Sequence, residues 1–263
     1  MPDRVAFEWG GRYGLTLAVL DGQWLFCSDL DGAFVIDMPR RTIRCFVQKP
    51  CEPGWQDVFV RRVLPRVAIL AGASAIHGAA VATAHGAILL LGESGTGKST
   101  LSAALGRAGW DILSDDISVI WAPATPEVAP ATTGVCLWQD SRDALALPAA
   151  GCAPMPAYKG KCRYTSGHDT GVAAQPLRAL AFLARSREAA VPGLQRLAAG
   201  TGLIEMARQR IRFNPADNRR ETLAAFAQHS AIMRVTPCYR LSYPADYTAL
   251  PRVEALLRGL ASA

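Results

Sequence analysis

A glycine-rich stretch that ends in a lysine and a serine carries the clearest chemistry in this sequence. Residues Gly92–Ser99 read GESGTGKS and match the pattern G-x-x-x-x-G-K-[S/T] at every fixed position. Glycines let such a loop curl until several backbone N–H groups point into one concavity, where they bind phosphate oxygens. Lys98 can then contact the outer phosphates, and the Ser99 hydroxyl can bind Mg²⁺. The stretch predicts a site for ATP and Mg²⁺.

The elements that must position this loop are a strand before it and a helix after it. The apolar run Ala87–Leu91 predicts a buried strand, and the good helix formers of Ser99–Gly109 predict a helix. Strand, loop and helix in this order are the context that a nucleotide-binding P-loop requires. The nucleotide-binding residues predicted here are Glu93, Ser94, Gly95, Thr96, Gly97, Lys98, Ser99 and Thr100.

Two adjacent carboxylates, Asp115 and Asp116, interrupt the apolar segment Ile112–Ile120. Their burial in a strand would be costly unless a cation or hydrogen bonds compensate for it. Neighbouring strand residues face opposite sides, so a carboxylate reaches Mg²⁺ only from a strand end or a bulge. A phosphotransfer site needs a metal-holding carboxylate and a proton acceptor, and this pair could supply both. The alternative is a solvated turn between two strands.

Two further sets of residues could join the same site. His77 lies in the small, apolar segment Ser74–Ala84, and it would approach the phosphates if that segment pairs beside the loop's strand. A packed core histidine is the alternative. Lys159, Lys161 and Arg163 alternate along the chain, which places them on one face of an extended strand. That row could hold a phosphate or an acidic substrate, or it could be an ordinary solvated face.

Hydrophobic periodicity gives the remaining elements. Short strands with intervening turn residues fill positions 5–47, and apolar residues at helical spacing follow over Trp55–Leu70. Further along the chain, strands are predicted at 110–120, 177–184 and 233–242, and helices at 192–208, 217–230 and 251–260. We expect an α/β protein with a small N-terminal β-rich region at residues 1–54 and a P-loop domain with a mixed central sheet at 55–263.

Composition narrows the classes of partner. The chain has 263 residues, of which 50% are hydrophobic, and a formal charge of +6. Its longest apolar runs are far shorter than the roughly 20 residues of a membrane span, so no membrane association is expected. No basic run is interleaved with aromatic residues, which argues against nucleic acid as a partner. The first ten residues do not read as a secretory signal, and a cytoplasmic location is expected.

Taken together, His77-Gly78, the loop Gly92–Ser99 and Asp115-Asp116 resemble the core of the HPr kinase/phosphorylase family. These are bacterial P-loop enzymes that phosphorylate a serine on a small carrier protein. The similarity covers His77–Ile120, with weaker similarity through Lys159–Leu183. The layout looks closest to shorter HPr-kinase-related proteins of modified-peptide biosynthesis, including kinases of lasso-peptide precursors.

This resemblance implies roles for individual residues. Lys98 and Ser99 would hold the phosphates and Mg²⁺, Asp115 would be the base for an incoming serine hydroxyl, and Asp116 would lie near the metal, with His77 at the active site. The partner would be a peptide or small protein that carries the acceptor serine. Because HPr kinase assembles as a hexamer, the resemblance also implies self-association.

The family's Arg-Gly-Leu-Gly signature does not follow the double Asp here, and the region before His77 is shorter than in HPr kinases. The resemblance therefore gives no support for the reverse, phosphorylase reaction.

Two other functions are compatible with the same nucleotide site. One is a kinase that acts on the hydroxyl of a small metabolite in a closed acceptor pocket. The other is an ATP-binding sensor or scaffold protein that recruits a partner without catalysis. The P-loop specifies only the donor side, so it does not separate these alternatives.

Overall fold

The computed structural model describes residues 3–9, 14–28, 32–49, 54–131, 134–155, 160–165, 173–186, 190–216 and 219–262. The chain forms two compact units. Residues Met1–Ala73 and Ile211–Ala224 make the first unit, and Ser74–Arg210 and Ala225–Ala263 make the second. The domain boundary expected after residue 54 stays a prediction, and the helices that follow that residue lie in the first unit.

The first unit is built on an antiparallel sheet of five strands in the order β1-β2-β3-β4-β5. The strands are β1 (Arg4–Trp9), β2 (Leu15–Leu20), β3 (Gln23–Ser28), β4 (Gly32–Asp37) and β5 (Thr42–Phe46). Asp21 and Gly22 both have positive φ and join β2 to β3 in a two-residue hairpin, as their residue types indicate. The β-rich N-terminal region expected from the sequence is confirmed.

A continuous helical segment packs its apolar face on this sheet. It consists of α1 (Gly54–Val58), a π-helical turn η1 (Phe59–Val63) and α2 (Leu64–Leu70). Pro65 lies near the start of α2 and has no N–H to donate, which accounts for the irregular helix just before it. The core of this unit includes Phe34, Val63 and Phe213, the last contributed by the later segment of the unit.

The second unit is built on a mixed sheet of eight strands. Its order is β10-β9-β6-β7-β14-β16-β15, and β8 also pairs with β6. Strand β7 pairs antiparallel with β6 and parallel with β14, which in turn runs parallel to β16. The strands are β6 (Ser74–Thr83), β7 (Gly86–Leu91), β8 (Asp111–Ser114), β9 (Ile117–Trp121), β10 (Glu127–Ala129), β14 (Gln175–Ser186), β15 (Gly193–Arg196) and β16 (Cys238–Pro244). The expected mixed central sheet is confirmed.

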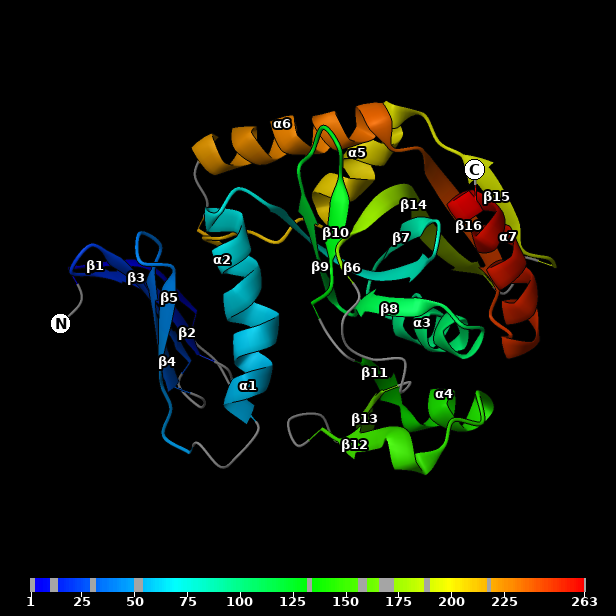
Figure 1. The fold of residues 1–263 in the computed structure, drawn as a ribbon, viewed down its shortest axis with the longest axis horizontal. Coiled ribbons are helices and arrows are strands. Elements are labelled where there is room, and N and C mark those ends of the chain that lie inside the picture. Colours follow the sequence, from blue (N-terminus) through cyan, green and yellow to red (C-terminus); the bar gives the residue numbers. More distant parts are fainter. Residues whose placement is uncertain are drawn as a thin grey trace. The chain divides into compact units, whose positions relative to one another are not determined.

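Helices cover both faces of this sheet (Figure 1). Alternate residues of β7 face opposite layers: Ile88 and Leu90 pack with α3 (Lys98–Arg107) and α7 (Leu250–Ser262). Leu89 and Leu91 belong to the opposite core, which contains residues of α5 (Ala199–Arg208) and α6 (Arg219–Val235). All six residues of β7 are buried, so the strand that leads into the glycine-rich loop lies at the centre of the unit.

A smaller antiparallel sheet in the same unit has the order β11-β13-β12. Its strands are β11 (Val135–Trp138), β12 (Cys152–Pro154) and β13 (Lys161–Tyr164), accompanied by α4 (Gln139–Ala144) and the short 3-10 helix η2 (Ala149–Gly151). A second 3-10 turn, η3 (Tyr247–Ala249), leads into α7.

Three expected elements differ from the structure. The segment 192–208 is not one helix, because β15 pairs with the edge strand β16 before α5 begins. The strand expected at 233–242 starts only at Cys238, because α6 continues to Val235. Pro237 ends this helix, since a proline disfavours the helical conformation of the residue before it. The third difference, at Asp115-Asp116, concerns the site and is described below.

Within the part of the chain that the structure describes, no helix is both long and apolar enough to cross a membrane.

Candidate active site

The glycine-rich loop lies between the end of β7 and the start of α3, as its pattern predicts. Gly92, Gly95 and Gly97 all have φ in the positive range, at 150°, 86° and 94°. An added Cβ at Gly97 would also lie 3.0 Å from the hydroxyl of Tyr243. Glycine is needed there for backbone conformation and for space, so the curl of the loop follows from the sequence.

Lys98 is the first residue of α3, and its side chain folds back over the loop. Its Nζ donates hydrogen bonds to the carbonyl oxygens of Gly92 (2.6 Å) and Glu93 (3.0 Å), and the residue is only 8% exposed. Burial lowers the pKa of Lys98, and the nearby Asp115 carboxylate opposes that shift. The ammonium group is thus held at the loop, where it can contact a phosphate.

Ser99 and Asp115 meet beside the loop. The Ser99 hydroxyl donates a 2.8 Å hydrogen bond to Oδ1 of Asp115, and the backbone N–H of Cys136 donates a 2.8 Å bond to Oδ2. Asp115 is 8% exposed, so these bonds stabilise a carboxylate that is largely removed from water. A hydroxyl and a carboxylate oxygen converge here, and hard oxygen ligands of this kind suit Mg²⁺.

The prediction of a single strand over 110–120 is wrong. It is broken into β8 and β9, and Asp115-Asp116 forms the connection between them. Asp116 has a φ of 77°, a left-handed conformation that a continuous strand does not contain. Because the strand is broken here, the two side chains need not point to opposite faces of the sheet, and the Asp115 carboxylate reaches Ser99. The pair combines the two readings left open by the sequence, because it is a turn and one of its carboxylates is buried.

His77 lies on β6, which pairs directly with the loop's strand β7, and is brought to the acidic pair. Its Nδ1 is 3.7 Å from Oδ1 of Asp116, and the next residue, Gly78, donates its N–H to the Asp116 carbonyl at 3.1 Å. Both side chains are about one-third exposed. The imidazole therefore lies beside the more exposed carboxylate, where it can influence the protonation of that group.

Two of the three predicted basic residues lie on β13. Lys161 and Arg163 are half-buried, and their alternation places them on the same face of the strand. Lys161 Nζ lies 4.8 Å from the ring centroid of Trp138, which is 55% exposed. Lys159 lies outside the described residues. The small sheet is tied to the site through β11, since the N–H of Cys136 bonds Asp115.

The sequence reasoning missed a set of residues on the other flank of the loop. Arg185 of β14 lines the space beside Glu93–Thr96, which has a volume of about 450 Å³ and is open to solvent. Tyr243 of β16 is the register partner of Arg185, and its hydroxyl donates a 2.8 Å hydrogen bond to the Thr96 carbonyl. Parallel strands end at the same edge of a sheet, so a polar residue near the end of 177–184 was a signal that could have identified Arg185.

Among the described residues, no group of three or more His, Cys, Asp or Glu side chains is arranged to hold a metal by itself. Ser99 and Asp115 provide two oxygens, with Asp116 next in the chain. Mg²⁺ usually keeps several waters and takes its other ligands from substrate phosphates. The residues present fit that mode of binding.

Among solved structures, the chain is similar to that of the HPr(Ser) kinase/phosphatase from Coxiella burnetii. The similarity covers 70% of this chain and 94% of that chain, with 13% sequence identity and a TM-score of 0.38. No protein-family model matches the chain, and no curated protein matches it. The fold and the loop define a mixed α/β protein with a glycine-rich loop between a buried strand and a helix.

Proposed function

We propose that this protein is an ATP-dependent kinase that transfers the γ-phosphate to a serine hydroxyl of a peptide or small protein. The observation that carries the proposal is the convergence of three groups at one loop. The buried ammonium of Lys98, the Ser99 hydroxyl and the Asp115 carboxylate meet where β7 passes into α3. A cation for phosphate and oxygens for Mg²⁺ are the parts that phosphoryl transfer requires.

The loop and its lysine would bind the donor. Backbone N–H groups of the loop and the start of α3 would bind the β- and γ-phosphates, and Lys98 would exchange its bonds to Gly92 and Glu93 for phosphate oxygens. Bound Mg²⁺, held by Ser99 and an aspartate, would neutralise the charge that develops on the phosphates. The serine oxygen forms a bond to the γ-phosphorus while the bond to the β–γ bridging oxygen breaks, and ADP leaves.

The structure supports an exchange of the roles that the sequence suggested for the two aspartates. Asp115 is buried and hydrogen-bonded to Ser99, an arrangement that suits a metal ligand. Asp116 is more exposed and lies 3.7 Å from His77, an arrangement that suits the base that takes the serine proton. We therefore assign the metal to Ser99 and Asp115 and the proton to Asp116, with His77 as the residue that positions this carboxylate and tunes its charge.

The acceptor side of the proposal rests on the small sheet. Lys161, Arg163 and the exposed ring of Trp138 provide cationic and aromatic groups on a strand pair linked to Asp115 through Cys136. Such a surface suits an extended peptide with acidic residues near its serine better than a small metabolite, which needs an enclosed pocket. A precursor of a lasso peptide is one substrate of this class. Self-association and a cytoplasmic location also remain predictions.

The test is phosphate transfer from ATP labelled on its γ-phosphate. The wild-type protein would be incubated with Mg²⁺ and a panel of serine-containing peptides, and in parallel with a panel of small hydroxyl metabolites. We expect label on a peptide serine, identified by mass spectrometry, and its loss in Lys98→Met. Lys49→Met, which removes an exposed lysine of the first unit, is the matched control.

Each other result points to a different function. If only a metabolite becomes labelled, the protein is a kinase of a small hydroxyl compound and not of a peptide. Tight ATP binding without transfer to any acceptor, and without release of ADP, would refute the kinase and favour a sensor or scaffold protein.

A further inference from the structure

Two buried hydroxyls lie at the base of the turn that carries Asp115 and Asp116. Ser114 is the last residue of β8 and Ser118 is the second residue of β9, and both are fully buried. Their Oγ atoms are 2.5 Å apart, which is a short hydrogen bond between two hydroxyls. The reaction proposed above uses neither serine. Because buried hydroxyls are hydrogen-bonded in native proteins, the partners of this pair show what it holds in place.

The contact between the two serines exists only because the strand is broken between them. A regular strand rises about 3.3 Å per residue, so residues four apart lie about 13 Å from each other, too far for two serine side chains to meet. Asp116, with its left-handed φ of 77°, interrupts the strand within this interval. The bond between Ser114 and Ser118 therefore closes the turn at its base, and it would be lost if the turn relaxed to a regular strand.

The hydrogen bonds of the two serines run in one direction, toward β6. The carbonyl oxygen of Gly78 can only accept, so its 3.1 Å contact with Ser118 Oγ uses the single proton of that hydroxyl. Ser118 then accepts the proton of Ser114 in the shorter contact. Ser118 is consequently the residue that joins the turn to β6, and Ser114 orients its hydroxyl.

Gly78 is held to the turn through both of its own backbone groups. Its N–H donates to the Asp116 carbonyl (3.1 Å), and its carbonyl accepts the hydroxyl of Ser118 (3.1 Å). In a regular antiparallel ladder, a residue exchanges both bonds with the backbone of the strand opposite. Here a side chain donates to the carbonyl, next to the residue with the left-handed φ. The two bonds together attach the turn to one residue of β6.

Gly78 is packed closely against the strand that leads into the glycine-rich loop. It pairs with Leu91 of β7, and an added Cβ would lie 2.8 Å from Leu91 Cδ2 and 2.9 Å from the Leu90 carbonyl oxygen. Only glycine allows so close an approach of two backbones. The bonds at Gly78 therefore position the aspartate turn relative to the same strand that carries the loop.

The same attachment sets the distance between Asp116 and His77. His77 directly precedes Gly78 in β6, and its Nδ1 lies 3.7 Å from Oδ1 of Asp116. A left-handed conformation is unfavourable for aspartate and persists only where the surrounding structure holds it. Without the bond from Ser118, the turn would relax toward extended backbone, and the Asp116 carboxylate would move away from His77.

We propose that Ser118 is a positioning residue for phosphate transfer: its hydroxyl, oriented by Ser114, holds the aspartate turn on Gly78 and so fixes the Asp116 carboxylate. The inference rests on the proposed function, and it adds two residues that neither the loop motif nor the acidic pair contains. A general base works only within hydrogen-bond reach of the proton that it takes, and a misplacement of about 1 Å can cost about 100-fold in rate. Ser118 therefore acts on the rate of transfer through the geometry of Asp116, and not on the binding of ATP.

Two measurements on the full chain test this role: steady-state kinetics with ATP and the acceptor, and amide hydrogen exchange at Gly78. Ser118→Ala should lower kcat by about 10- to 100-fold and change the KM for ATP by less than about two-fold. Exchange of the Gly78 amide should become about 10-fold faster or more, because its bond to Asp116 weakens when the turn relaxes. Ser114→Ala leaves the bond from Ser118 to Gly78 in place, so it should change kcat and the exchange rate by about five-fold or less.

Matched variants separate the loss of this bond from the loss of a buried serine. Ser74→Ala removes another buried serine of β6, whose hydroxyl donates to Gln228 (3.0 Å), and it should leave kcat and the Gly78 exchange rate unchanged. Ser118→Thr keeps the hydroxyl and should retain wild-type values of both. If Ser118→Ala is poorly folded, which its thermal unfolding would show, Ser118→Cys replaces the hydroxyl by a weak donor and should show the same losses.

The outcomes separate this inference from the proposed function. A wild-type kcat and an unchanged Gly78 exchange rate in Ser118→Ala would overturn the positioning role and leave the kinase standing. Losses in Ser74→Ala as large as those in Ser118→Ala would also overturn it, because any buried serine would then have the same effect. If the wild-type protein transfers phosphate to no acceptor, the proposed function fails. Exchange at Gly78 then still decides whether Ser118 holds the turn: faster exchange in Ser118→Ala supports that attachment, and an unchanged rate refutes it.

Discussion

The two sides of the first turn of α3 differ in how their residues are distributed along the chain. The acidic side, which consists of His77, Ser99, Asp115 and Asp116, comes from one continuous span that includes the loop. The opposite side is a narrow cleft lined by residues from three distant segments, and we call it the cleft side: Thr100, Arg185, Tyr243, Asp246 and Tyr247. A site whose residues lie close together in the sequence can be recognised there as a motif. A surface whose residues come together only through the order of the strands in a sheet cannot.

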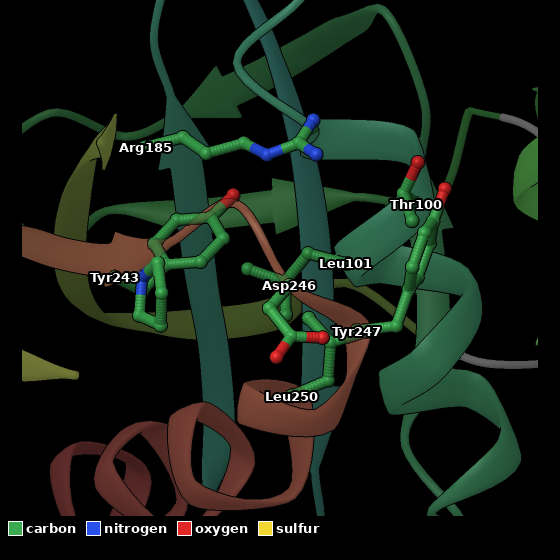
Figure 2. A pocket seen from close by; sticks show the side chains of 9 residues that line it. Thr100, Leu101, Arg185, Tyr243, Asp246, Tyr247 and Leu250 are labelled. Atoms are coloured by element: carbon green, nitrogen blue, oxygen red, sulfur yellow. The ribbon is translucent and has the colours of Figure 1, made fainter. Parts of the chain in front are cut away.

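The two sides also differ in how they hold charge. Asp115 is largely buried and is stabilised by hydrogen bonds from Ser99 and the Cys136 N–H, so its geometry is fixed. On the cleft side, Arg185 and Asp246 stand at opposite edges of an apolar body (Figure 2). We infer that the acidic side governs the chemical step. The cleft side supports the loop and the start of α3, and through them ATP affinity, by the bonds of Tyr243 to Thr96 and of Thr100 to Ser141.

Replacement of the acidic pair should affect turnover more than ATP affinity. Removal of a general base typically costs about 10²- to 10⁴-fold in rate, so Asp116→Asn should lower kcat by that factor. Asp115→Asn should raise the Mg²⁺ concentration needed for half-maximal activity, because the buried metal oxygen becomes an amide. Kinetics at varied Mg²⁺ would distinguish the roles. If Asp115→Asn lowers kcat and Asp116→Asn raises the Mg²⁺ requirement, Asp115 is the base. Full activity in both variants would exclude the pair from catalysis.

The buried hydroxyl of Tyr243 should make the cleft side sensitive to alkali. Burial raises the pKa of Tyr243 from 10.0 to about 12, and Arg185 opposes the shift. The folded protein therefore keeps this proton between pH 10 and 12 while the unfolded chain releases it, so stability is present below pH 10 and lost as pH rises to 12. The linked loss is about 3 kcal/mol in the free energy of unfolding. Urea unfolding should show it in the wild type and not in Tyr243→Phe.

Tyr239→Phe on the same strand is the control for that experiment, since it removes a tyrosine hydroxyl outside the cleft. A wild-type protein and Tyr243→Phe with parallel stability profiles from pH 9 to 12 would contradict the buried, protonated hydroxyl.

Alanine variants of two loop glycines should distinguish the cost of backbone strain from the cost of contact with the cleft side. Gly95 and Gly97 both have left-handed φ, so alanine at either position should cost about 1 kcal/mol of stability. Only at Gly97 would the added Cβ meet a neighbour, the Tyr243 hydroxyl at 3.0 Å, whereas nothing lies within 4 Å at Gly95. Gly97→Ala should therefore cost about 1 kcal/mol more than Gly95→Ala in urea unfolding. Equal losses would mean that Tyr243 moves aside freely.

Ser141 should give the smallest effect. Its hydroxyl lies between Thr100 and Tyr247, so Ser141→Ala removes one link in the polar edge of the cleft. A neutral hydrogen bond contributes about 1 kcal/mol, and we expect ATP binding to weaken about five-fold or less with kcat unchanged. Ser262→Ala, at the end of α7, is the control. A fall in kcat with unchanged ATP affinity would contradict this prediction, because it would mean that Ser141 affects the chemical step and not ATP binding.

The sequence predicts the conformation of the glycine-rich loop well because its constraints are local. Glycines that need positive φ, an apolar strand before them and helix formers after them all lie within about 20 residues, and the structure contains each element. The central sheet could also be predicted, because 87–91 is continuously apolar and 177–184 is apolar except at Arg178, as expected of strands that are buried on both faces over most of their length. The order of the strands could not be predicted, since it depends on pairings between residues far apart in sequence.

The errors have physical causes of the same kind. The apolar pattern of 110–120 does not reveal that Asp116 adopts a left-handed conformation, which depends on its carbonyl accepting the N–H of Gly78 from another strand. The segment 192–208 has helical periodicity throughout, but pairing with β16 takes its first residues into a strand. Arg185 and Tyr243 became neighbours only through the register of β14 with β16. Tertiary contacts decided each of these cases over local preference.

The position of β7 between two hydrogen-bonded neighbours has a consequence for hydrogen exchange. Its six residues are buried and paired with β6 on one edge and β14 on the other, so their amides can exchange only when the central sheet opens. Glu93 to Gly95 follow immediately and are exposed. Protection should therefore fall steeply from Leu91 to Glu93, across the single residue Gly92. The glycine-rich loop thus begins at a boundary between slowly and rapidly exchanging amides.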